Sequence, residues 1–123
     1  MLSEYKIGID IEEVKAVDMA DFYKCFTKNE LAYIHNSCNP TETFYKFWTK
    51  KEALIKADGR GLYIPLLEFE VIDNEVALHP DKWYLKELMV ADGYVAHLAA
   101  SFEIAHQYTV QKIDLWTALF KLY

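Results

Sequence analysis

The longest periodic stretch of the chain, Thr41 to Ala57, constrains the fold more than any other feature. Asn39 can act as its N-cap with Pro40 at the first helical position, and Gly59 suits the left-handed conformation that commonly ends a helix. At about 100° per residue the apolar side chains fall on one arc. They are Phe44, Phe47, Trp48, Leu54 and Ile55. The sequence therefore predicts one long amphipathic helix that buries one face against another layer.

The remaining patterns predict strands and shorter helices. Strands are expected at Tyr5–Ile11, Phe69–Ile72, Val76–Leu78, Trp83–Met89, Tyr94–Ser101 and Tyr108–Lys112. Further helices are expected at Met19–Cys25, Lys28–Asn36 and Leu115–Leu122. The second and third strands are expected to pair as a hairpin across the turn at 73–75. Because helices and strands are segregated along the chain, we predict a single α+β domain over residues 1–123, with an antiparallel sheet packed against the helices.

Composition narrows the class of protein. The 123 residues are 53% hydrophobic and 15% aromatic, enough for the buried core of one domain. A net charge of −6 lacks the basic surface that non-specific nucleic-acid binding requires. No window approaches the roughly 20 apolar residues that cross a bilayer, and no leader pattern opens the chain. A soluble, cytoplasmic protein is expected, with no nucleic-acid or membrane partner and with Cys25 and Cys38 as free thiols.

Asp10 and Glu12 form an unusual acidic pair in the first strand. They are two residues apart, so they share one face of the strand about 7 Å apart, opposite Ile9 and its neighbouring isoleucines. Two carboxylates held this close repel each other unless a cation lies between them. An edge strand with its acidic residues in solvent explains the pattern as well, so the pair alone leaves both interpretations open.

The long helix carries three more charged residues of interest. Lys51 falls inside the apolar arc and Glu52 on its margin, while Lys56 follows Glu52 by four residues. Lys51 can extend its ammonium along apolar surface to water, and Glu52 with Lys56 can be an ordinary helix ion pair. The following loop, Gly59 to Gly61, can approach an anion closely or simply end the helix.

Taken together, these residues suit a particular ligand chemistry. Asp10, Glu12 and Glu52 offer carboxylates to a hard divalent cation, and Lys56 offers a cation to phosphate. Mg²⁺ takes few protein carboxylates and shares the phosphates of its substrate, so the set favours a Mg²⁺–pyrophosphate site. Walker loops, zinc-type His and Cys spacings and nucleophile elbows are missing from the sequence. The four histidines are expected to be structural or on the surface: His35, His79, His97 and His106.

The motifs, in this order and at these separations, resemble the 4′-phosphopantetheinyl transferases. The resemblance is to the C-terminal lobe of the two-lobed type that activates peptide and polyketide synthetases, and it runs from Lys6 to Ala100. It rests on Gly8–Glu12, Phe26 and Thr27 with Glu30, Phe47–Ala57, Gly59–Leu62, and Pro65 and Leu66 with Phe69.

The resemblance implies transfer of 4′-phosphopantetheine from coenzyme A to a serine of an apo carrier protein, with Mg²⁺ as cofactor and release of 3′,5′-ADP. Asp10, Glu12 and Glu52 match the metal-binding carboxylates of the family. Lys56 matches the lysine that contacts the phosphates and assists the leaving group, and Lys51 stands at the other motif lysine, expected to bind the coenzyme. Either Glu52 or a metal-bound water could accept the proton of the serine.

The sequence departs from the family in length and in one motif. Two-lobed members are about twice as long, and residues 91–101 lack the Ser/His pattern of the single-lobe carrier-protein synthases. We therefore expect a transferase whose site is completed by a second copy, as a homodimer or homotrimer, or by a separately encoded lobe. The alternatives are a non-catalytic lobe that binds coenzyme A or a carrier protein, and a structural domain with accidental motifs. Retention of Asp10, Glu12, Glu52 and Lys56 favours the enzyme.

Overall fold

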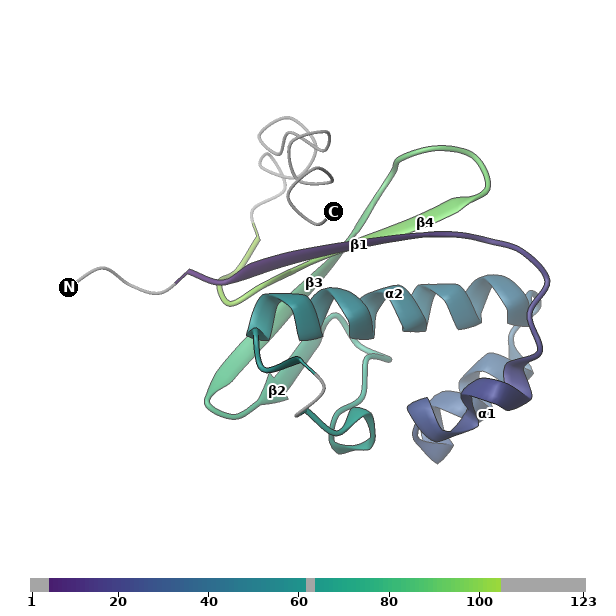
Figure 1. The fold of residues 1–123 in the computed structure, drawn as a ribbon, viewed down its shortest axis with the longest axis horizontal. Coiled ribbons are helices and arrows are strands. Elements are labelled where there is room, and N and C mark those ends of the chain that lie inside the picture. The colour runs from purple at the N-terminus through teal and green to yellow at the C-terminus, as the bar shows by residue number, and fades with distance from the viewer. Residues whose placement is uncertain (1–4, 62–63, 105–123) are drawn as a thin grey trace.

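The computed structural model describes residues 5–61 and 64–104. Four strands form one antiparallel sheet in the order β1-β4-β3-β2, with α2 lying across one face (Figure 1). In chain order the elements are β1 (Ile7–Glu13), the 3₁₀ helix η1 (Met19–Cys25), α1 (Lys28–Asn36), α2 (Pro40–Asp58), the 3₁₀ helix η3 (Leu66–Glu68), β2 (Glu75–Leu78), β3 (Asp81–Leu88) and β4 (Tyr94–Ala100). The predicted α+β class and antiparallel sheet are confirmed.

Local capping interactions set the ends of the two α-helices as the sequence predicts. Asn39 caps α2 by accepting a hydrogen bond from the backbone of Glu42, and Gly59 ends it with a φ of 85°. Thr27 and Glu30 form a reciprocal capping box at the start of α1. The strand and helix predicted at 108–112 and 115–122 lie outside the described residues.

The predicted strand Phe69–Ile72 is wrong. This segment is not part of the sheet, and β2 pairs instead with β3. Its polar backbone groups are bound by side chains from the helices: Lys51 donates to the Phe69 carbonyl, Lys50 donates to the Val71 carbonyl, and the Val71 amide donates to Glu30. Phe69 and Val71 are buried, so the apolar alternation reflects burial rather than strand pairing.

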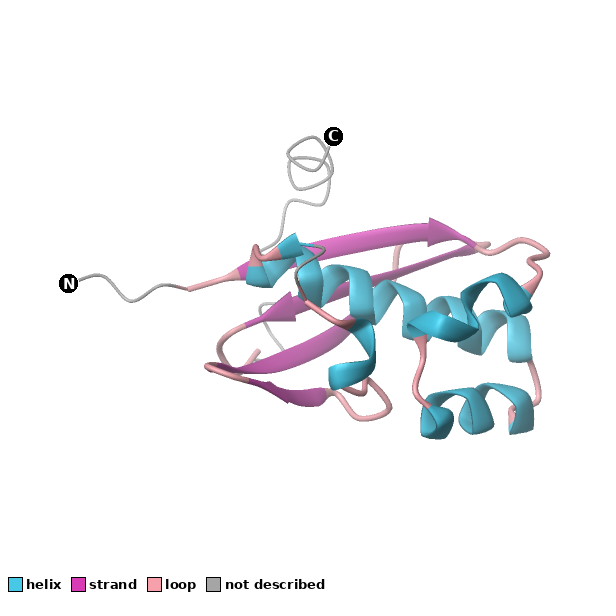
Figure 2. Cartoon of the chain, turned by 60° about the horizontal axis from the view of Figure 1, so that its bottom comes forward, coloured by secondary structure: helices cyan, strands magenta, loops and turns pink. Residues whose placement is uncertain are grey.

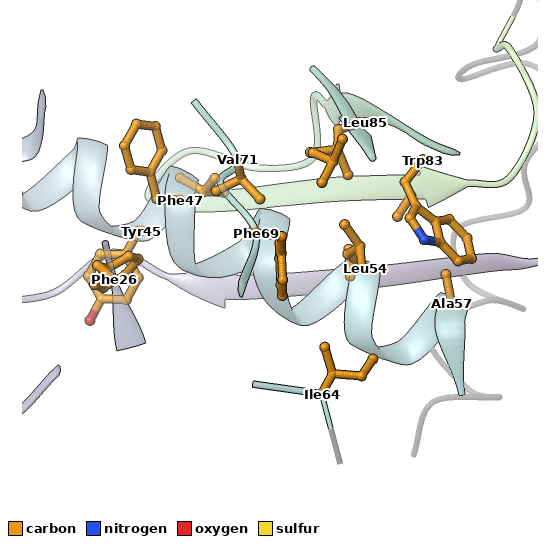
Figure 3. Close-up of a cluster of buried hydrophobic side chains, with 14 of the residues drawn as sticks. Phe26, Tyr45, Phe47, Leu54, Ala57, Ile64, Phe69, Val71, Trp83 and Leu85 are labelled. Carbon is orange, nitrogen blue, oxygen red and sulfur yellow. The ribbon is translucent and has the colours of Figure 1, made fainter. Parts of the chain in front are cut away.

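The helices lie on one side of the sheet, and the main core fills the space between these layers (Figure 2). Trp83 and Leu54 are fully buried there, one from β3 and one from α2 (Figure 3). A smaller cluster of Ile9, Leu88, Ala96 and Leu98 forms a second group of buried residues. Within residues 5–61 and 64–104, no helix is both long enough and apolar enough to span a bilayer.

Gly8 sets how closely β1 approaches α2. A Cβ atom at this position would lie 2.4 Å from the carbonyl oxygen of Ala53 and 2.5 Å from the backbone nitrogen of Ala57. Side chains alternate across a strand, so Asp10 and Glu12 lie on the same face as Gly8, toward the helix. The acidic face of β1 is therefore the face that meets α2, and the isoleucines point to the other side of the sheet.

Candidate active site at the junction of β1 and α2

Asp10 and Lys56 join β1 to α2. The ammonium Nζ of Lys56 lies 2.8 Å from Oδ1 of Asp10, whose side chain is 5% exposed while that of Lys56 is 33% exposed. The other carboxylate oxygen of Asp10, Oδ2, is buried and has no hydrogen-bond partner among the described residues. An unpaired, buried carboxylate oxygen is costly to stability, so its presence indicates a position for a ligand.

Glu12 and Glu52 share this electrostatic environment. Burial raises the pKa of Glu12 to about 7, aided by the adjacent Asp10 carboxyl and by the charge of Glu52, while Lys56 opposes the shift. Burial also raises the pKa of Glu52, again with Asp10 adding to the shift and Lys56 opposing it. The structure thus brings together four of the five residues predicted for the site.

The chemistry of this cluster suits a hard cation. All the candidate ligand atoms are carboxylate oxygens, which Mg²⁺ prefers, and their mutual repulsion is what a cation would relieve. Across the described stretches, however, no group of three or more His, Cys, Asp or Glu side chains is arranged to hold a metal ion. In this arrangement the ammonium of Lys56 supplies the positive charge beside Asp10.

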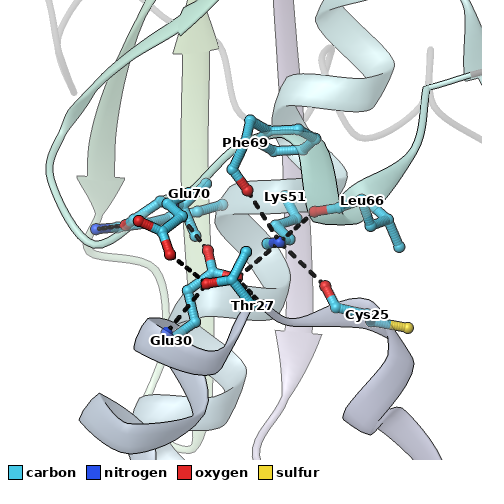
Figure 4. Close-up of polar contacts among 9 residues, drawn as sticks. Cys25, Thr27, Glu30, Lys51, Leu66, Phe69 and Glu70 are labelled. Carbon is cyan, nitrogen blue, oxygen red and sulfur yellow. Dashed lines mark hydrogen bonds and ion pairs between the residues drawn. The ribbon is translucent and has the colours of Figure 1, made fainter.

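Lys51, the fifth predicted residue, lies elsewhere and is fully buried (Figure 4). Its ammonium is 2.8 Å from Oε1 of Glu30, and burial lowers its pKa while Glu30 opposes the shift. It also donates to the carbonyl oxygens of Cys25, Leu66 and Phe69, at 3.0, 2.6 and 3.3 Å. An ammonium has three protons, and four acceptors surround this one. The expectation that Lys51 binds the coenzyme is corrected accordingly, because no part of its ammonium is open to a phosphate.

Glu30 is the residue that the sequence interpretation missed. Its carboxylate pairs with Lys51 and also accepts hydrogen bonds from the backbone of Thr27 and Val71, at 2.9 and 2.8 Å. The capping-box pattern accounts for the contact with Thr27 but not for the ion pair. The available signal was Lys51 itself, because a lysine within an apolar arc requires a buried partner.

The positive charge in the loop after α2, that of Arg60, is already paired. Arg60 forms two hydrogen bonds with the carboxylate of Asp58, at 2.6 and 2.9 Å, and a third with the carbonyl of His79 at 3.2 Å. Gly59 and Gly61 both have positive φ, which fits a helix end followed by a turn. Of the two interpretations left open for this loop, the geometry favours the helix cap.

These observations define an α+β domain with the buried Asp10 paired to Lys56 where a strand meets a helix, and with Glu12 and Glu52 in the same electrostatic environment. Residues 6–99 match the family model described as the 4′-phosphopantetheinyl transferase superfamily. The chain belongs to this superfamily.

Curated relatives agree with this assignment. The chain is 33% identical to the 4′-phosphopantetheinyl transferase gsp of Aneurinibacillus migulanus, over 93% of this chain and 52% of that protein. It is 34% identical to the 4′-phosphopantetheinyl transferase Sfp of Bacillus subtilis, over 77% of this chain and 46% of that protein. The chain therefore spans about half the length of these relatives.

Solved structures support the fold. The chain is similar to the holo-[acyl-carrier-protein] synthase of Thermotoga maritima, with a TM-score of 0.61 and 17% identity over 80% of this chain and 64% of that one. It is similar also to an ACPS–CoA complex from Chronobacterium ammoniagenes, with a TM-score of 0.60 and 18% identity over 83% of this chain and all of that one.

Proposed function

We propose that this chain transfers 4′-phosphopantetheine from coenzyme A to a serine of an apo carrier protein, with release of 3′,5′-ADP. The observation that carries the proposal is the Asp10–Lys56 contact, with Glu12 and Glu52 in the same electrostatic environment. Superfamily membership supports the reaction class. The names of the two transferase relatives and the similarity to a protein solved as a complex with CoA support the substrates.

The reaction moves a phosphoryl group that carries the pantetheine arm. The serine oxygen forms a bond to the pantetheine-linked phosphorus while the bond from that phosphorus to the bridging oxygen of 3′,5′-ADP breaks. Lys56, which pairs with Asp10, would bind the phosphates and stabilise the negative charge that develops on the leaving group. Burial raises the pKa of Glu52, which suits this carboxylate to accept the proton of the serine near neutral pH.

Asp10, Glu12 and Glu52 would hold Mg²⁺ in this site. The all-oxygen donor set and the unpaired Oδ2 of Asp10 favour such an ion, although the described side chains are not arranged around one position. When bound, Mg²⁺ neutralises charge on the pyrophosphate of coenzyme A.

The active unit contains a second lobe. The chain spans about half the length of the curated relatives it matches. A second copy of this chain is one source of the remaining part of the coenzyme site. The second candidate function is binding of coenzyme A or a carrier protein without transfer.

The test is transfer itself. The purified chain is incubated with coenzyme A, Mg²⁺ and a panel of apo carrier proteins, and intact mass reports the added phosphopantetheine. Glu52→Gln should lower the rate at least about 100-fold, because it removes a charge that acts on the reacting groups. Glu42→Gln is the matched control, since Glu42 lies on the same helix and pairs with Lys46 at 3.4 Å. Equal rates for the two variants would refute the site, and carrier binding without transfer would establish the second function.

A further inference from the structure

A groove lined by both polar and apolar side chains lies on the other flank of α2 from the carboxylates. It has a volume of about 760 Å³ and runs between α1 and α2, with strands β3 and β4 contributing to its wall. Lys46, Phe47 and Lys50 line it from α2. At about 100° per residue, these positions are on the side of the helix opposite Glu52 and Lys56. The groove therefore lies on the opposite side of α2 from Glu52 and Lys56, although His97 in its wall is directly across from Asp10 in the β1–β4 pair.

His97 presents a hydrogen-bond acceptor to this groove. Its side chain is 1% exposed and lies in the groove wall, with Nδ1 2.7 Å from Oγ1 of Thr49. The hydroxyl of Thr49 also lies 2.8 Å from the carbonyl oxygen of Tyr45 and 3.0 Å from that of Lys46. These two acceptors favour the tautomer in which the hydroxyl donates to the helix backbone, Nδ1 of His97 donates to Thr49, and Nε2 is an acceptor. In the described part of the chain Nε2 has no hydrogen-bond partner.

The imidazole of His97 is neutral across the physiological range. Burial, with the positive charges of Lys50 and Lys46, lowers the pKa of His97 to about 3. Glu87 lies directly across from His97 in the β3–β4 pair and lines the same groove. Its carboxylate makes no ion pair or hydrogen bond with any described residue. The sheet side of the groove thus offers two acceptors.

The α2 side offers donors. Lys50 is 8% exposed, and its ammonium donates to the Val71 carbonyl at 2.9 Å and lies 5.7 Å from the centre of the Phe47 ring. One hydrogen bond leaves further protons of the Lys50 ammonium for a ligand. Lys46, one turn away, pairs with Glu42 at 3.4 Å. Donors and acceptors therefore face each other across the groove.

We propose that this groove binds a small zwitterion of the amino-acid type. The carboxylate of the ligand lies at Lys50 and Lys46, and its ammonium lies at Glu87 and Nε2 of His97. The rings of Tyr33 and Phe47, whose centres are 5.4 Å apart, form an apolar wall for the side chain of the ligand.

The distribution of charge selects this class of ligand. A simple anion would meet Glu87, whose charge also acts on Lys50. A simple cation would meet Lys46 and Lys50. Only a ligand with both charges satisfies both sides, and the volume is within the usual range of small-molecule sites.

The first experiment separates the two charges of the ligand. Three compounds are titrated into the full chain without coenzyme A or Mg²⁺. The first is L-phenylalanine. The others are 3-phenylpropanoate, which lacks the ammonium, and 2-phenylethylamine, which lacks the carboxylate. Isothermal titration calorimetry gives Kd, and NMR chemical shifts locate the site. We expect phenylalanine to bind at least about tenfold more tightly than either analogue, with shifts at the groove residues. Because no transfer is measured, the result is independent of the proposed function.

The second experiment removes one protein charge at a time. Lys50→Met and Glu87→Gln should each weaken phenylalanine binding at least about tenfold. Lys15→Met and Glu13→Gln are the matched controls, since that exposed pair lies outside the groove, and they should leave Kd unchanged. Glu87 is exposed, so its variant tests the proposal even if Lys50→Met does not fold. Any one of three results would overturn the proposal. These are the absence of chemical-shift changes at the groove residues with phenylalanine, equal Kd values for the three compounds, and an unchanged Kd in Glu87→Gln.

Discussion

Asp10 is the residue on which the site depends. One of its carboxylate oxygens pairs with Lys56, and the other is buried without a partner among the described residues. Glu12 and Glu52 add like charge to the same region and have raised pKa values. Such an arrangement lowers the free energy of unfolding of the unliganded protein, so we infer that these residues bind a ligand.

Replacing Glu12 separates the stability effect of this cluster from its function. Because the folded pKa of Glu12, about 7, lies above its ordinary value, wild-type stability falls as the pH rises toward 7. Glu12→Gln should therefore raise the free energy of unfolding by about 1 kcal/mol at pH 8 and by little at pH 4.5, while lowering transfer. Urea unfolding at the two pH values measures the difference. Glu13→Gln, at the exposed neighbouring position, should change neither the free energy of unfolding nor the transfer rate. An equal gain in stability at both pH values would contradict repulsion between the charged carboxylates.

At the scale of the elements, α2 contributes residues to the candidate site, to the groove and to the buried ion pair. One side carries Glu52 and Lys56, another carries Lys50 toward the groove, and Lys51 reaches into the interior. The segment around Phe69 is held by side chains from α1 and α2 where a strand would use backbone pairing. The helix thereby positions both the candidate site residues and the adjoining loop.

The buried ion pair between Lys51 and Glu30 should behave as one unit. Lys51→Met leaves the Glu30 carboxylate buried without its countercharge, so it should lower the free energy of unfolding by about 3–5 kcal/mol. Adding Glu30→Gln should cost less than the two single changes summed, because the second change removes the orphaned charge. Urea unfolding of the four proteins in the cycle measures the coupling. Additive effects would contradict the ion pair.

The close approach of β1 and α2 gives a second test at this scale. Gly8→Ala would place a Cβ atom within 2.5 Å of backbone atoms of α2, so the strand must move away. We expect a loss of about 3 kcal/mol in the free energy of unfolding, measured by urea denaturation, because overpacking against backbone is not relieved by a side-chain rotation. Ala20→Gly, in the short helix η1, is a control for an Ala/Gly exchange away from this contact. Wild-type stability in Gly8→Ala would show that the two elements are not packed this tightly.

At the scale of the whole molecule, the chain spans about half the length of the curated relatives it matches. The proposed transferase requires a second lobe. Association of like copies also has to overcome a net charge of −6 on each one, which added salt would screen.

We expect sedimentation equilibrium to find a homodimer or homotrimer at micromolar concentrations, with transfer activity falling on dilution as the oligomer dissociates. Salt in the physiological range should favour the oligomer, because it screens the repulsion between copies. A monomer with full activity at every concentration would contradict this arrangement. Activity that appears only after addition of another protein would identify a separately encoded lobe.

The sequence by itself determined the features that depend on near neighbours in the chain. These include the span of α2 from its Asn39 cap to Gly59, the capping box of α1, and the placement of Asp10 and Glu12 on one face of a strand. Caps and alternation arise within a few residues, so local patterns suffice to predict them.

Only the tertiary structure decided which distant groups meet. It placed the acidic face of β1 against α2, gave Lys51 a buried partner in Glu30, and removed the segment around Phe69 from the sheet. It also placed the groove residues of α2 across from those of β3 and β4. These outcomes depend on residues far apart in the chain that competed for the same buried space and the same hydrogen bonds, and no local pattern records which of them prevailed.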